Sequence, residues 1–261
     1  GNNNGCVSRG SSNIGNIPPT GSGVRFMWYP RKAAIRAGRV EGANWDDQRV
    51  GESSTAFGWD VSARGEASVA MGFGAVATER GALAAGSNTT ASGVGSVALG
   101  LNTAAAGVGS MATGFDTDAM GLAAIALGSS TFAGGVAATA LGIGTKAFGE
   151  ASLALGTGTE AHGAHSIAGA FDTSAGAEYS IALGNQSYSS AIGGIWIGTM
   201  TVASGQLSTA MGYQADTNGR MGAFVYADAA TAAFRNFRAQ TNQEFAVRAS
   251  GGVRFRTSSL L

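Results

Sequence analysis

The chain has 261 residues, of which 43 are glycine and three are proline, and 16 basic residues balance 16 acidic ones. The glycines are too irregularly spaced for a collagen, and the aliphatic content is too high for a disordered chain. Without a basic surface or an apolar stretch of about 18 residues, we expect neither a nucleic-acid partner nor a membrane span.

Residues 1–50 are predicted to form an N-terminal arm and a cap. The cap is rich in aromatic side chains, namely Trp28, Tyr29 and Trp45. A stack of strands leaves unpaired edges at its ends, and a cover over these edges prevents uncontrolled stacking. The alternative is controlled end-to-end assembly, in which the polar arm reaches into a neighbouring molecule. Cys6 has no partner for an intrachain disulfide, so it is either an unpaired thiol or a link between chains.

Residues 51–219 repeat with a period of 14. Starting at Gly58 and stepping by 14, eleven of twelve positions are glycine, and the exception is Ala170. An alanine stands two residues before each of these positions, except at Trp196. Fourteen residues are too few for a pair of helices, and each glycine would destabilise a helix by about 1 kcal/mol. Two short strands and two tight turns fit, so each repeat is predicted to be one coil of a parallel β-solenoid with glycine at its corners.

The first strand of each coil is predicted to carry an apolar outer face. Side chains alternate between the two faces of a strand, so the residues three and one before the glycine share a face, and none of these 24 is charged. A stripe this large is unusual on a soluble monomer, and burying each side chain contributes about 1.5–3 kcal/mol. We therefore expect a homo-oligomer with the stripe inside. The residues assigned to this interface are Val69, Met71, Val97, Leu99, Ile125, Leu127, Leu141, Leu153, Leu155, Ile181, Leu183, Ile195 and Ile197.

The second strand is predicted to turn small residues inward. A column of alanines lies five residues after the glycine, and a column of threonines lies two residues before these alanines, from Thr89 to Thr173 and at Thr201. The alternate positions of this strand vary freely in size and charge, so they are expected to face solvent. The interior is thus predicted to be thin, because only Ala, Gly and Thr columns fill it.

Trp196 is the largest departure from the repeat. It replaces an alanine within SAIGGIWIG, where Gly193 and Gly194 also break the pattern. Either the coil bulges to admit the indole, or the strand slips by one residue so that Trp196 faces outward. We expect a packing role for this side chain rather than a ligand site.

Residues 220–261 leave the period and are predicted to form a β-rich base or assembly segment. The stretches GAFVYADA, AAFRNF, EFAVRA and GVRFRT alternate apolar and polar residues, as short strands do. Five arginines make the segment basic: Arg235, Arg238, Arg248, Arg254 and Arg256. A base that docks onto the solenoid is favoured over a polyanion site.

The repeats SVALGLNTAAAG, SIALGNQSYSS, SLALGTGTEAHG and STAMGYQADTNG resemble the head repeats of trimeric autotransporter adhesins, the YadA-like head domain. The resemblance covers residues 51 to about 219. It implies a left-handed parallel β-roll, three chains around a long axis, and a secreted bacterial surface protein. The left-handed sense comes from the resemblance alone, because the general rule for crossover connections favours the right-handed sense.

The ending NQEFAVRASGGVRFRTSSLL resembles the stretch that precedes the self-cleaving intramolecular chaperone of phage tail-fibre proteins. In that case Leu261 is a processed C-terminus. The alternative is that Leu261 is only a boundary of the sequence.

No catalytic, cofactor or metal site is expected. His162 and His165 are three residues apart, but no third Cys or His and no paired carboxylate stands at ligand spacing, so both are interpreted as surface residues. The acids of the variable face lie several coils apart, which does not suit glycoside hydrolysis. Regular threonine arrays can bind ice, but this threonine column is assigned to the interior.

These expectations describe an all-β, homotrimeric, non-enzymatic fibrous protein outside a bacterial cell, with any signal peptide removed. One hypothesis is an adhesin-like head that attaches the cell to a surface, a matrix or a glycan ligand. The alternative is a structural subunit whose trimers join end to end into an extracellular filament or sheath.

Overall fold

The computed structural model describes residues 17, 20–229 and 236–255, so Cys6, Arg235, Arg256 and Leu261 lie outside the described residues. The chain divides into two compact units, residues 1–137 and 138–261. Within the described residues, the only helices are two 3-10 turns, Pro30–Lys32 and Asp47–Arg49, and no helix could cross a membrane. The all-β prediction is therefore confirmed.

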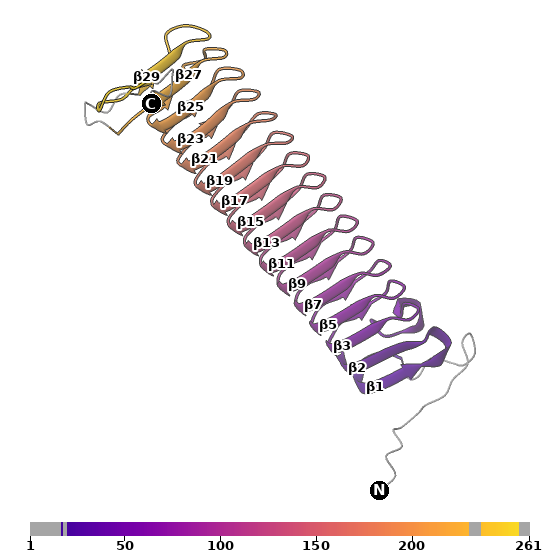
Figure 1. Ribbon diagram of the computed structural model, residues 1–261. Coiled ribbons are helices and arrows are strands. Elements are labelled where there is room, and N and C mark those ends of the chain that lie inside the picture. Colours follow the sequence, from indigo (N-terminus) through magenta and orange to yellow (C-terminus); the bar gives the residue numbers. More distant parts are fainter. Residues whose placement is uncertain (1–16, 18–19, 230–235, 256–261) are drawn as a thin grey trace, which may run out of the picture. The chain divides into compact units, whose positions relative to one another are not determined.

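The first unit begins with a hairpin of β1 (Gly23–Tyr29) and β2 (Ala34–Val40), which precedes six coils (Figure 1). The long strands of these coils are β3 (Thr55–Trp59), β5 (Val69–Phe73), β7 (Leu83–Ser87), β9 (Val97–Leu101), β11 (Met111–Phe115) and β13 (Ile125–Ser129). The short strands are β4 (Ser62–Ala63), β6 (Val76–Ala77), β8 (Thr90–Ala91), β10 (Ala104–Ala105), β12 (Asp118–Ala119) and β14 (Phe132–Ala133). Long strands pair in parallel with long strands, and short with short.

The second unit repeats this arrangement. Its long strands are β15 (Thr139–Ile143), β17 (Leu153–Thr157), β19 (Ile167–Phe171), β21 (Ile181–Asn185), β23 (Ile195–Thr199) and β25 (Thr209–Tyr213). Its short strands are β16 (Lys146–Ala147), β18 (Glu160–Ala161), β20 (Ser174–Ala175), β22 (Tyr188–Ser189), β24 (Val202–Ala203) and β26 (Ala215–Asp216). In both units paired residues are 14 apart, as Ala98 and Ala112 are, which confirms the parallel solenoid.

Three further strands extend the same two sheets of the second unit. They are β27 (Phe224–Ala227), β28 (Phe237–Arg238) and β29 (Phe245–Arg248). Thr209 pairs with Phe224 and Phe224 with Phe245, so the spacing lengthens from 14 to 15 and then to 21 residues. Strands were predicted in all four C-terminal stretches. β27 and β29 lie within GAFVYADA and EFAVRA, β28 begins at Phe237, the last residue of AAFRNF, and residues 252–255 of GVRFRT form no strand.

The interior of the coils consists of small side chains. Both alanine columns, from Ala56 to Ala210 and from Ala63 to Ala203, are fully buried, and so are the threonines from Thr89 to Thr201. Buried serines complete the interior at the second corner, where the hydroxyl of Ser68 donates a hydrogen bond to the Gly65 carbonyl (2.7 Å). The threonine column is thus inside, as predicted, and offers no flat outer array to ice.

The repeated glycines lie within the long strands, which corrects the prediction that they occupy the corners. Gly100 has φ +122°, and a Cβ built on it would lie 2.0 Å from the carbonyl oxygen of Gly114 in the next coil. Glycine is therefore required at this position for two reasons: the backbone of the next coil approaches closely, and φ is positive. The true corners tolerate other residues in the left-handed region, such as Asn102 (φ 54°) and Ala123 (φ 53°). Ala170, which replaces a repeated glycine, has φ 88°.

Candidate functional site

The outer face of the long strands is the main candidate site. On each strand the first, third and fifth residues point away from the buried second residue, which is alanine except for Trp196 on β23. The thirteen predicted interface residues occupy the first and third positions, and all are half-buried or exposed: Val69, Met71, Val97, Leu99, Ile125, Leu127, Leu141, Leu153, Leu155, Ile181, Leu183, Ile195 and Ile197. The chain alone therefore leaves each of these side chains accessible to a partner.

A third apolar column, at the fifth strand position, was missed in the sequence. It includes the exposed residues Trp59, Phe73, Leu101, Phe115, Ile143 and Phe171. Adjacent members contact one another, since the rings of Trp59 and Phe73 lie 5.1 Å apart in a T-shaped pair. Polar residues such as Ser87 and Ser129 interrupt this column, so it is difficult to recognise in the sequence. The alternation of side chains along a strand nevertheless places the fifth residue on the same face as the first and third.

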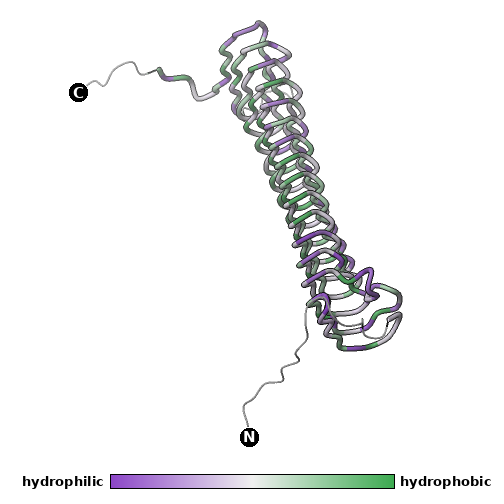
Figure 2. The backbone as a smooth tube through the Cα atoms, turned by 90° about the vertical axis from the view of Figure 1, so that its right-hand side faces the viewer, coloured by the Kyte–Doolittle hydropathy of each residue, from purple (hydrophilic) through white to green (hydrophobic). Residues whose placement is uncertain are grey.

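The opposite face, on the short strands and second corners, is less uniform. In the first unit, charged residues are concentrated in the coils next to the cap, among them Arg64, Glu66 and Arg80 (Figure 2). The later coils of that unit expose Val108 and Leu122 at the same corner. This variation fits a surface whose chemistry is not constrained by the repeat.

The β1–β2 hairpin covers the open end of the first unit. β2 pairs in parallel with β3, and the fully buried Arg36 points into the open coil. Its guanidinium donates hydrogen bonds to the Ser54 hydroxyl (2.7 Å) and to the carbonyls of Ser54 and Ala63 (2.9 Å each). Burial lowers the pKa of Arg36 to about 10. The coil end therefore closes on a cation whose two terminal nitrogens donate to carbonyls and to a serine hydroxyl, while its buried Nε has no hydrogen-bond partner among the described residues.

Two of the three predicted cap aromatics belong to this cover. Trp45 is fully buried and donates from Nε1 to the Val61 carbonyl (3.0 Å). Tyr29 is also buried, and its hydroxyl donates to Asp47 Oδ1 (2.8 Å). This hydrogen bond, together with Lys32 at 3.2 Å, lowers the pKa of the Asp47 carboxyl.

Trp28 lies elsewhere. It is on the face of β1 opposite to Met27 and Tyr29, and it pairs with Ile35. Ile35 in turn pairs with Thr55, the first residue of the outer face on β3. Trp28 thus extends the apolar outer face beyond the coils, as do the more exposed residues of β1.

Trp196 keeps the register of the repeat. It pairs with Ala182 and with Ala210, and it is fully buried. Of the two alternatives, the inward one is observed, and the strand does not slip. The Tyr188 ring stacks near the indole, with 6.4 Å between centroids and 28° between planes.

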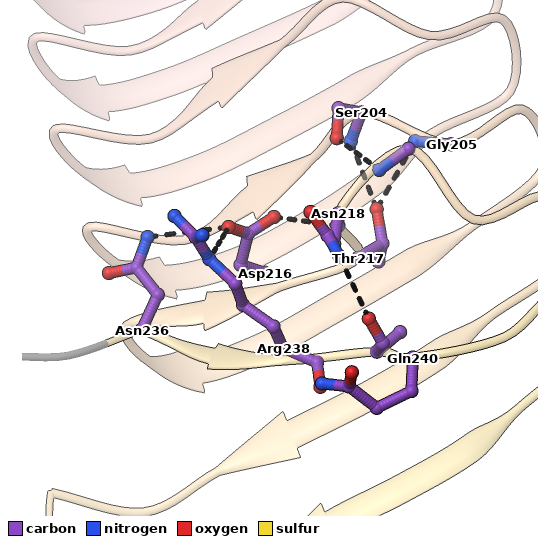
Figure 3. Close-up of polar contacts among 10 residues, drawn as sticks. Ser204, Gly205, Asp216, Thr217, Asn218, Asn236, Arg238 and Gln240 are labelled. Atoms are coloured by element: carbon purple, nitrogen blue, oxygen red, sulfur yellow. Dashed lines mark hydrogen bonds and ion pairs between the residues drawn. The ribbon is translucent and has the colours of Figure 1, made fainter.

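The C-terminal segment docks onto the last regular coil through a buried carboxylate (Figure 3). Asp216 Oδ2 forms an ion pair with Arg238 Nε (2.9 Å) and accepts a hydrogen bond from Asn236 Nδ2 (3.4 Å), while Oδ1 accepts one from the backbone N–H of Asn218 (2.7 Å). Arg248 is similarly paired with Asp228 (3.4 Å). These contacts support docking of the basic segment over polyanion binding.

The two histidines have separate partners. His162 Nε2 lies 2.9 Å from Glu160 Oε2, and its ring stacks on Phe148, whereas His165 stacks on Tyr179. Hydrogen bonds from His162 and Lys146 lower the pKa of the Glu160 carboxyl. No group of three or more His, Cys, Asp or Glu residues suited to a metal occurs within the described part of the chain.

A family model described as "YadA head domain repeat (2 copies)" matches residues 50–75, 63–89, 77–103, 91–117, 133–159, 149–168 and 197–220. A search of curated proteins finds no match. The matched segments coincide with the 14-residue coils and confirm the resemblance of the head repeats. The likeness of the C-terminal stretch to the one before a phage tail-fibre chaperone stays a prediction, as do the left-handed sense and the trimer. The chain therefore contains YadA head domain repeats within residues 50–220.

Proposed function

We propose that three copies of this chain form the head of a bacterial surface protein and share the outer face of their long strands. The head acts outside the cell, without catalysis, by attaching it to another surface. Residues 51–219 form the head, residues 1–50 its arm and cap, and residues 220–261 its base. The match to YadA head domain repeats supports this proposal, because YadA-like heads are homotrimeric and exposed on the bacterial surface.

The apolar outer face is the observation that carries the proposal. The first and third strand positions of all twelve coils hold no charged residue, and all of them except Gly169 stay accessible in the single chain. The interior alanines are meanwhile completely buried, so the larger side chains have no place inside the coil. An accessible apolar face of this extent marks an interface between proteins. Identical chains with the same face can cover it symmetrically.

A filament subunit is the second candidate function, and β1 favours it. Within the described residues β1 pairs with β2 only, so its other side is a free edge. Its residues Val24 and Phe26 are 79% and 74% exposed. Exposed apolar edge strands promote pairing with another chain. End-to-end assembly of trimers would cover this edge.

Negative-stain microscopy distinguishes the two functions. Discrete particles support the head, whereas filaments that lengthen with protein concentration support the subunit.

Attachment is tested with protein-coated beads on surfaces that carry matrix proteins or glycans. Beads coated with the chain should be retained where albumin-coated beads are not. Equal retention of both kinds of bead on every surface would contradict the attachment function.

A further inference from the structure

The repeat is broken in one neighbourhood of the second unit. Ala170 stands in the glycine column, Ser189 in the second alanine column and Trp196 in the first. In the six coils of the first unit these three columns contain no exception. Ala170 also adopts φ 88°, which is strained for a residue with a Cβ. Departures from a local rule without an evident gain in packing are expected at functional sites.

A groove lies beside these departures. It has a volume of about 450 Å³, and its lining comes from three successive coils: Gly158, Glu160, Asp172, Thr173, Ser174, Gln186, Ser187 and Tyr188. The groove follows the first corners after β17, β19 and β21 and the short strands β18, β20 and β22. Its volume lies within the range of small-molecule sites. All lining residues belong to one unit of one chain.

The groove combines an aromatic platform with hydrogen-bonding groups. Tyr188 is 55% exposed, and the buried Trp196 stacks near it. Asp172 and Gln186 are exposed beside it, at corner positions with left-handed φ of 49° and 51°. A carboxylate accepts hydrogen bonds, and an amide both donates and accepts them, so neighbouring hydroxyl groups of a ligand can be satisfied together.

The Glu160 carboxylate is held at the opposite side of the groove. Lys146 Nζ lies 3.0 Å from Oε1 and His162 Nε2 lies 2.9 Å from Oε2. Because both oxygens have partners in the protein, the carboxylate keeps one orientation and still has a free lone pair on each oxygen. It can therefore accept a further hydrogen bond without reorganising.

We propose that this groove binds a neutral saccharide, with the Tyr188 ring under the apolar face of a sugar and with Gln186 and Asp172 at its hydroxyl groups. The described lining contains two carboxylates, Glu160 and Asp172, and no basic residue, which disfavours phosphate, sulfate and carboxylate ligands; Lys146, which pairs with Glu160, lies outside the lining. Tyr188 is the only large apolar side chain of the lining, which is too little for a lipid. The inference gives the proposed attachment function a ligand class and rests on that function for its biological role, but binding itself needs only one chain.

The test titrates the soluble full chain with maltose, lactose and cellobiose, and follows saturation-transfer NMR of the sugar and tryptophan fluorescence of the protein. At least one disaccharide should bind saturably at millimolar concentration, whereas inorganic phosphate and a sulfated disaccharide should not. Tyr188→Ala should weaken binding about tenfold or more. Gln186→Gly should also weaken it, and glycine suits this corner because Gly158 occupies the same position two coils earlier with φ +64°.

Tyr179→Ala is the matched control. Tyr179 is also 55% exposed, and it stacks on His165 outside the groove. This variant should bind the disaccharide as the unchanged chain does. Absence of saturable binding to all three sugars, equal binding by Tyr188→Ala, or binding of only the sulfated sugar would overturn the proposal. None of these results depends on the mass of the assembly or on bead retention, so failure of this site and failure of the proposed function are distinguishable.

Discussion

Replacing Ile197 with glutamate tests whether the outer face is an interface between copies. Ile197 lies on β23 and is 41% exposed in the single chain. Complete burial of an isoleucine contributes about 1.5–3 kcal/mol, so the exposed part contributes about 0.6–1.2 kcal/mol per chain and about 2–4 kcal/mol per trimer. That loss alone weakens association about 30- to 700-fold. Burying three carboxylates at the interface adds several kcal/mol per charge.

The control uses the other face of the same coil. Ile192 is 47% exposed at the second corner, and the neighbouring coils carry Glu178 and Gln206 at this position. Ile192→Glu therefore introduces the same charge into an already polar column. Light scattering after size exclusion should find Ile197→Glu as a monomer and Ile192→Glu as a trimer, with unchanged circular dichroism for both. A trimeric Ile197→Glu would refute the assignment of the outer face to the interface.

Three further predictions concern stability. Gly100→Ala should lower the free energy of unfolding by more than about 4 kcal/mol, because the new Cβ would overlap the backbone of the next coil. Gly95 has open space around it, so Gly95→Ala should lower the free energy of unfolding by only about 1–2 kcal/mol. Urea melts measure both values. Arg36→Leu should cost about 2–4 kcal/mol in the same melts, because it removes the buried hydrogen bonds from the guanidinium to Ser54 and Ala63, and hydrogen exchange should increase first in that coil. The pKa of Asp47 is lowered in the folded chain, so its carboxylate stabilises the fold above the unfolded pKa, and this stabilisation is lost as the pH falls below about 4. Thermal melts of Asp47→Asn should lack the part of the acid-induced loss of stability that Asp47 contributes.

The coil itself could be predicted because the sequence repeats without insertion. Identical residues then stack at every 14th position, and this alone sets the parallel register that Ala98 and Ala112 show. The alternation of small and large residues also places the alanines inside, where small side chains fill the space between the sheet of long strands and the sheet of short strands. Trp196 is buried in the same register as the alanines, so one large side chain does not shift the pairing of the strands.

The structural features that were not predicted involve residues that do not recur regularly from one repeat to the next. The third outer column is interrupted by serine, threonine and asparagine, so its aromatic members do not form a recognisable column in the sequence. Trp28 was grouped with Tyr29 as a cap residue, although neighbours on one strand point to opposite faces. The groove beside Tyr188 depends on residues from three coils, and no single repeat contains it.

The C-terminal turns could not be placed from spacing. Their paired strands are 15 and 21 residues apart, and a period that occurs only once is not recognisable in a sequence. The alternation of apolar and polar residues did identify β27 and β29 as strands. Asp216, which pairs with Arg238 on β28, belongs to the variable face that was expected to face solvent, because the arginine lies 22 residues later in the sequence.

Sedimentation equilibrium of the unchanged chain, under reducing conditions and at decreasing concentration, tests the central claim most directly. The apolar face that one coil cannot bury predicts a mass of three times 25.8 kDa, about 77 kDa, that persists on dilution. A stable species of 25.8 kDa with a native circular dichroism spectrum would contradict the account.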